Sequence, residues 1–218
     1  MEKRVGTWEK IGDLKKWITN QNIEKAIYCT VGADLPKAIK TLIREKCPLL
    51  NLDYRTPLPI KNQYKTPKTL GKDRLAAIMG AHALYPDQAA LVIDAGTCVT
   101  YDVLDNKRQY LGGNISPGWQ MRLDAMEHFT AKLPRPETKA LDNWLGEDTN
   151  SALQDGAYYG LLFEMQGYIN EIKTKYPFVN VLLTGGDAEF FAKKLKSKIF
   201  VNQNLVLIGL NKTLHYNV

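Results

Sequence analysis

Hydrophobic residues along the chain follow two alternating patterns. Short apolar runs of strand length occur at residues 26–31, 90–93 and 179–183. Between such runs, apolar residues recur at the three- and four-residue spacing of a helix face, as in residues 35–47 and 75–83. Strands that alternate with helices are typical of α/β proteins. We therefore predict an α/β fold.

Weaker signals complete this assignment. Further strands are predicted at residues 48–52 and 98–103, and further helices at residues 119–129, 151–173, 188–196 and from Leu205 onward. Residues 53–70 are rich in Pro, Thr and Lys, which predicts an exposed loop. Residues 131–148 are expected to be irregular.

Composition and charge exclude several classes of protein. The 218 residues are 44% hydrophobic and 24% charged, which suits one large globular domain or two small ones. The net charge of +6 would suit nucleic acid, a membrane surface or an anionic substrate. The alternative is a solvated surface with surplus lysine. The most basic stretch, residues 193–198, has no interleaved aromatics to stack bases and no nucleic-acid motif. No apolar run is long enough to span a membrane, so we expect neither a nucleic-acid nor a membrane partner.

The cysteines and histidines give no metal or disulfide pattern. Cys29, Cys47 and Cys98 are odd in number and have no C-x-x-C spacing, and the three histidines are scattered. This argues against a disulfide framework and a zinc site, and predicts a cytoplasmic protein.

Three glycine turns follow predicted strands and are candidates for phosphate binding. They are Asp94-Ala95-Gly96-Thr97, Gly112-Gly113 with Pro117-Gly118 behind it, and Thr184-Gly185-Gly186-Asp187. Glycine lets backbone N–H groups approach a phosphate, a threonine hydroxyl adds a donor, and an aspartate can hold a cation. Each turn taken alone could equally be a bare turn. Three of them in one short chain favour nucleotide binding.

Gly71-Lys72-Asp73-Arg74 opens a predicted helix and is a candidate substrate site. Arg74 could bind a carboxylate through two hydrogen bonds, and Asp73 could accept a proton from a hydroxyl. The alternative is an acidic first helical turn that complements the helix dipole, followed by a solvated arginine.

In this order, the segments resemble the type III pantothenate kinases. The resemblance covers nearly the whole chain, and it is the ordered set of motifs that makes it specific. The matching segments are the loop from Tyr64 to Leu70 with Gly71-Lys72-Asp73-Arg74, Ile93 to Thr97 with Thr100, Gly112 to Gly118, Leu133-Pro134, Asp148 to Gly156, Leu183 to Ala188, Asn204-Leu205 and Gly209-Leu210.

The resemblance implies a fold, an activity and partners. Such kinases belong to the superfamily of acetate and sugar kinases, heat-shock chaperones and actin, in which two ribonuclease H-like halves enclose a nucleotide cleft. We expect the halves at residues 1–88 and 89–218. The implied reaction is ATP-dependent phosphorylation of pantothenate, the first step of coenzyme A synthesis, by a homodimer that needs a monovalent cation, K⁺ or NH₄⁺, and Mg²⁺ with ATP. The alternatives are a non-catalytic binding or regulatory relative and, more weakly, another kinase of the superfamily.

The resemblance also implies roles for individual residues. Asp73 would be the general base, Asp94 would bind the monovalent cation, and two sets of residues would bind the substrates. The expected pantothenate contacts are Tyr64, Gly71, Lys72, Arg74 and Thr149, and the expected ATP contacts are Gly96, Thr97, Gly185 and Gly186.

One family feature is not found in these 218 residues. The family begins with a strand that carries D-x-G-N-T, the first phosphate motif, and residues 1–25 contain no such motif, since Gly6-Thr7 has no acidic residue before it. We expect the first half to lack its initial strands and to leave unpaired strand edges. A truncated version starting at Met1 and a natural short form would both explain this, and the intact pattern elsewhere favours truncation.

Overall fold

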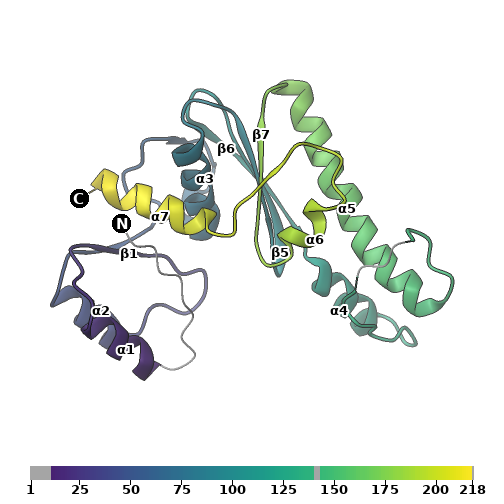
Figure 1. Cartoon of the computed structure of the whole chain (residues 1–218), viewed down its shortest axis with the longest axis horizontal. Helices are drawn as coiled ribbons and strands as arrows, with labels where there is room; N and C mark the ends of the chain where they lie inside the picture. The colour runs from purple at the N-terminus through teal and green to yellow at the C-terminus, as the bar shows by residue number, and fades with distance from the viewer. Residues whose placement is uncertain (1–10, 140–142, 218) are drawn as a thin grey trace.

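The computed structural model describes residues 11–139 and 143–217, and its elements alternate between strands and helices (Figure 1). The first ten residues, which include Gly6-Thr7, lie outside the described residues. The strands are β1 (Ala26–Tyr28), β2 (Leu49–Asn51), β3 (Lys61–Asn62), β4 (Ala90–Ala95), β5 (Cys98–Leu104), β6 (Gln109–Pro117), β7 (Asn180–Thr184) and β8 (Phe200–Val201). The helices are α1 (Ile11–Thr19), α2 (Lys37–Arg44), η1 (Pro67–Thr69), α3 (Lys72–Leu84), α4 (Trp119–Phe129), α5 (Thr149–Lys175), α6 (Ala188–Ala192) and α7 (Leu205–Asn217). The predicted α/β class is confirmed.

A six-stranded mixed sheet forms the centre of the molecule, in the order β3-β6-β5-β4-β7-β8. β4, β5 and β6 are antiparallel neighbours, whereas β7 is parallel to both β4 and β8. Both faces of β4 are buried, because Leu91 and Ile93 belong to one apolar cluster and Ala90 and Val92 to another. This explains why β4 reads as a continuous apolar run.

Helices cover both faces of this sheet. Buried residues of α4, α5 and α6 share the cluster of Leu91 and Ile93, and buried residues of α3 and α7 share the cluster of Ala90 and Val92. α3 and α5 therefore lie on opposite faces of the sheet. None of the described helices is both long and apolar enough to cross a membrane.

α3 and α7 cross at very short range (Figure 1). A Cβ atom at Gly80 would overlap the carbonyl oxygen of Leu205, and one at Gly209 would overlap the carbonyl oxygen of Ala76. Only glycine lets two helix backbones touch in this way. α3, which carries Asp73 in its first turn, is thus held by the last described helix of the chain.

A smaller unit is formed by the first elements. β1 and β2 pair in parallel, and α1 and α2 pack together around Ile18, Ile39 and Ile43. The division of the chain at residues 88 and 89 stays a prediction.

Two expectations about local structure were wrong. Residues 53–70 are not simply an exposed loop, because they contain β3 and η1 and bury Ile60 and Leu70. Gly112 and Gly113 do not form a turn at a strand end, because they lie inside β6, paired with Val103 and Asp102 of β5.

Candidate active site

Two of the predicted glycine turns meet at the end of β4. Asp94 pairs with Thr184 across the parallel strands β4 and β7, so the turns after both strands open at the same sheet edge. Gly185 has φ +94°, and a Cβ atom there would overlap the carbonyl oxygen of Ala95. The Asp187 N–H donates a hydrogen bond of 3.0 Å to that same oxygen. Gly185 therefore serves a close packing of the two turns that no larger residue permits.

Gly118, at the end of β6, joins the same site. Its N–H donates to the carbonyl oxygen of Thr97 at 3.0 Å, and a Cβ atom there would overlap the carbonyl oxygen of Gly96. A pocket of about 400 Å³ opens beside these turns. It is lined by Gly96, Thr97, Gln120, Met121, Asp124, Gly186 and Asp187. The structure thus gathers three of the four expected ATP contacts around one pocket, with Gly185 packed behind it.

Asp94 is half-buried, and its surroundings disfavour its negative charge. Burial and the nearby carboxylates of Asp73 and Asp102 raise the pKa of Asp94 to about 6. A carboxylate held in this way gains free energy when a cation binds beside it. Asp73 and Asp94 come from different elements, α3 and β4.

Asp73 and the residues around it form the first turn of α3. Gly71 is the N-cap residue, and the Arg74 N–H donates to Asp73 Oδ1 at 2.8 Å. Asp73 and Lys72 are half-buried. A Cβ atom at Gly71 would lie 2.6 Å from Asp73 Oδ1, so glycine leaves room for this carboxylate. Both features favour a carboxylate that is oriented and still reachable by a substrate hydroxyl.

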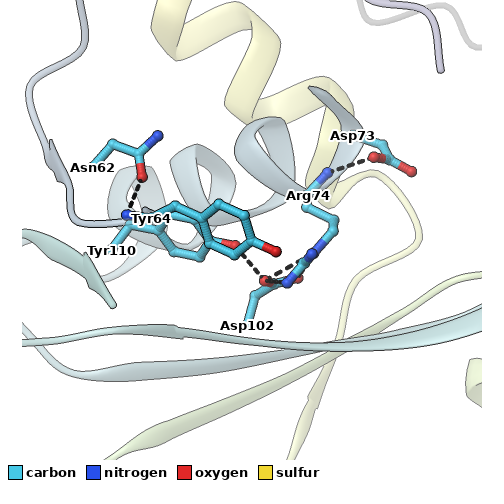
Figure 2. A network of polar contacts seen from close by, with 6 residues as sticks. All are labelled: Asn62, Tyr64, Asp73, Arg74, Asp102 and Tyr110. Atoms are coloured by element: carbon cyan, nitrogen blue, oxygen red, sulfur yellow. Dashed lines mark hydrogen bonds and ion pairs between the residues drawn. The ribbon is translucent and has the colours of Figure 1, made fainter. Parts of the chain in front are cut away.

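Arg74 is buried and paired (Figure 2), so the alternative of a solvated arginine is wrong. Its Nε lies 3.1 Å from both carboxylate oxygens of Asp102, and its Nη2 lies 2.7 Å from Oδ1. Arg74 is 5% exposed and Asp102 is 0% exposed. A buried charge must be paired in this way because its desolvation is costly.

Two tyrosines complete this network (Figure 2). The Tyr110 hydroxyl donates to Asp102 Oδ1 at 2.6 Å, and the Tyr64 ring stacks on Tyr110 with centroids 6.2 Å apart. The Tyr64 ring also lies 5.6 Å from the Arg74 guanidinium carbon. Asp102 and Tyr110 were not among the predicted site residues. The available signal was a carboxylate in the middle of an apolar strand, which must find a partner when it is buried.

Thr149 is not brought together with these residues. It is the exposed first residue of α5, after the Asp148 N-cap, whose side chain accepts hydrogen bonds from the N–H groups of Asn150 and Ser151. α5 and α3 cover opposite faces of the sheet (Figure 1), so Thr149 and Asp73 lie in the first turns of helices on opposite sides of it.

A cation at Asp94 would need ligands beyond side chains. Within residues 11–139 and 143–217, no group of three or more His, Cys, Asp or Glu side chains is arranged to hold a metal ion. Backbone carbonyls, water or ATP would have to supply the remaining oxygen ligands, as hard cations accept. The site can therefore combine a cation carboxylate, a proton acceptor and backbone donors for phosphate.

Sequence comparisons with known proteins indicate one family. A family model described as type III pantothenate kinase matches residues 8–171. A type III pantothenate kinase from Bacteroides fragilis is 45% identical over 210 residues, covering 96% of this chain and 86% of the relative. One from Flavobacterium johnsoniae is 43% identical over 218 residues, covering 100% and 86%. A crystal structure from Campylobacter jejuni, described as a Baf family transcriptional activator, has a similar fold. Its TM-score is 0.62 at 23% identity, with 94% of this chain and 88% of that one covered.

Proposed function

The chain belongs to the type III pantothenate kinase family, and on that basis we propose that it transfers the γ-phosphoryl group of ATP to the primary hydroxyl of pantothenate. The product, 4'-phosphopantothenate, enters coenzyme A synthesis, which we place in the cytoplasm. One observation carries the proposal. The turns that follow β4 and β7 open at the same sheet edge beside Asp94, where Gly96, Thr97 and Gly186 line one pocket.

In the proposed reaction, Asp73 accepts the proton of the pantothenate hydroxyl. The hydroxyl oxygen then bonds to the γ-phosphorus, the bond from that phosphorus to the β,γ-bridging oxygen breaks, and ADP leaves. Phosphoryl transfer of this kind depends on positioning and on neutralising charge more than on covalent chemistry by the protein. Backbone groups of Gly96, Gly185 and Gly186 and the Thr97 hydroxyl would hold the ATP. Mg²⁺ would arrive with it.

The monovalent cation, K⁺ or NH₄⁺, would bind at Asp94. The raised pKa of this carboxyl supports the assignment, because a group that is costly to ionise alone gains more when a cation compensates its charge. The cation would neutralise negative charge where the ATP phosphates approach Asp73 and Asp94.

Pantothenate would lie along the first turn of α3. Gly71, Lys72 and Tyr64 surround this turn, and Arg74 would meet the pantothenate carboxylate. Thr149, the fifth expected contact, lies on the opposite face of the sheet within one chain. Within the proposal, its contact with pantothenate would come from a second copy of the chain in a homodimer.

The alternative is a relative that binds ligands without turnover. The 218 residues contain no D-x-G-N-T motif, so the test of this alternative includes a version of the chain that supplies it. The retained pair of Asp73 and Asp94 favours catalysis, since a pure binding protein has no evident use for a base and a cation carboxylate together.

A coupled ADP-release assay with ATP, Mg²⁺, K⁺ and pantothenate tests both functions. The 218-residue chain is compared with a version that carries an upstream D-x-G-N-T hairpin. Turnover by either version supports the kinase. Two folded proteins without turnover would support the non-catalytic alternative.

A further inference from the structure

Arg74 has a partner inside the protein, and this changes how it can recognise a substrate. Asp102 occupies the side edge of the guanidinium, formed by Nε and Nη2. Arginine has a second, end-on edge formed by Nη1 and Nη2, and its planar group presents donors in fixed directions. A carboxylate at the side edge therefore dictates where the end edge points.

Tyr110 holds Asp102 in turn. Its buried hydroxyl donates to Asp102 Oδ1 at 2.6 Å. Burial, the Asp102 charge and this hydrogen bond raise the pKa of Tyr110 far above its ordinary value, so the hydroxyl remains a donor throughout the physiological range. Asp102 is thereby held by Tyr110 and Arg74 together, because both donate to its Oδ1 and Arg74 also donates to its Oδ2.

The glycine pair of β6 makes room for this arrangement. A Cβ atom at Gly113 would overlap the carbonyl oxygen of Tyr101 and lie 2.7 Å from Asp102 Oδ1. Gly112 has φ +110°, and a Cβ atom there would lie 3.4 Å from the Tyr64 ring. These glycines, first considered as a phosphate turn, serve the packing around Arg74.

The side chains of Asp73 and Arg74 leave α3 in different directions (Figure 2). Arg74 extends to Asp102 on β5, whereas Asp73 points away from it. Pantothenate carries its primary hydroxyl and its carboxylate at opposite ends of an extended molecule. Two divergent side chains from one helical turn suit these two ends.

We propose that Asp102 and Tyr110 are positioning residues that determine substrate specificity: they fix Arg74 so that its end-on edge meets the carboxylate of pantothenate. The inference rests on the proposed function. It assigns Asp102 a role through Arg74 and no contact with the substrate. A competing role is that Asp102 simply neutralises Arg74 and weakens its hold on the substrate.

The test compares pantothenate with pantothenol, in which an alcohol replaces the carboxylate. The quantity is kcat/KM for pantothenate divided by kcat/KM for pantothenol. It is measured in Asp102→Asn, in Tyr110→Phe and in the unmodified chain. Asp105→Asn is the matched control, because Asp105 is also buried beside β5 but accepts hydrogen bonds from the N–H groups of Lys107 and Gln109. Equilibrium dialysis of both ligands gives the same ratio for binding without turnover.

We expect Asp102→Asn to lower the ratio by about tenfold, as expected for the loss of an oriented, charge-assisted hydrogen-bond pair. Tyr110→Phe should lower it less, and Asp105→Asn should leave it unchanged. An unchanged ratio in folded Asp102→Asn, or a raised one, would overturn the proposal. If Asp102→Asn does not fold, Tyr110→Phe decides, because it keeps the ion pair.

Failure of the proposed function gives a different result. A chain that binds pantothenate without turnover refutes the proposed catalysis, and the binding ratio still tests the role of Asp102. A chain that binds neither ligand overturns the positioning proposal as well.

Discussion

Replacing Asp94 with Asn should stabilise the cation-free protein at neutral pH. Asparagine has the shape of a protonated aspartate and carries no charge. The Asp94 pKa rises from 3.8 to about 6 on folding, roughly two units, because of burial and the nearby Asp73 and Asp102. At 1.36 kcal/mol per unit, ionised Asp94 costs the folded state up to about 3 kcal/mol. Asp94→Asn removes this cost.

The sign of the pH dependence follows from the raised pKa. Between pH 3.8 and pH 6 the folded protein binds more protons at Asp94 than the unfolded chain does, so this group makes stability fall as pH rises. The folded state keeps its full stability with respect to Asp94 below pH 3.8, where the group is protonated, and loses that stability above about pH 6, where it is ionised. The stability gain of Asp94→Asn over the unmodified chain should therefore be near zero at pH 4 and full at pH 8.

Urea unfolding in choline chloride measures this gain without a binding cation. In KCl at equal ionic strength, the difference in unfolding free energy between Asp94→Asn and the unmodified chain should become smaller. K⁺ stabilises only the unmodified chain, which can bind it, by about 2.7 kcal/mol at one hundred times the dissociation constant of K⁺. A variant that is less stable than the unmodified chain at pH 8, or a gain of the same size at pH 4 and pH 8, would refute the account of Asp94.

Three further outcomes are expected. Asp73→Asn should lower kcat by about 10² to 10⁴-fold and leave the circular dichroism spectrum unchanged, since it removes only the proton acceptor. Turnover close to that of the unmodified chain would exclude Asp73 as the base. Gly209→Ala should lower the free energy of unfolding, measured in urea, by about 3 kcal/mol or more, because its Cβ would overlap the Ala76 carbonyl oxygen. Gly12→Ala is the control and should leave the free energy of unfolding nearly unchanged, because nothing lies within 4 Å of a Cβ there. Mixing Asp73→Asn with Thr149→Ala chains should restore part of the activity through mixed dimers that hold one intact site, and no gain over either variant alone would argue against sharing.

Local sequence signals predicted the elements that local signals can determine. α4 begins at Trp119 and ends at Phe129, as expected from its spacing, and the apolar run of β4 was clear. The two-residue strands β3 and β8 were not predicted, because they form only by pairing with β6 and β7. Strands this short carry no alternation that a pattern could show.

The candidate site was predicted in its pieces but not in its contacts. The glycine turns at Asp94 and Gly185 were expected separately, and the parallel pairing of β4 with β7 is what joins them. Gly113 was assigned to a turn because its partner, Asp102, becomes visible only with the strand register. Arg74 pairs with a buried acid because α3 packs against β5, a contact that the spacing of the motif could not reveal.

The crossing of α3 and α7 has a consequence for biosynthesis. Since the ribosome makes the N-terminal part first, α3 emerges long before α7, and its buried face has no partner until the rest of the sheet has been made. The contact between α3 and α7 joins residues far apart in the sequence, so forming it carries a loop-closure entropy cost that slows folding. We therefore expect the substrate end of α3 to be among the last parts to order in a nascent chain, so that a stalled or nicked product would bind pantothenate poorly and aggregate through the exposed apolar face of α3.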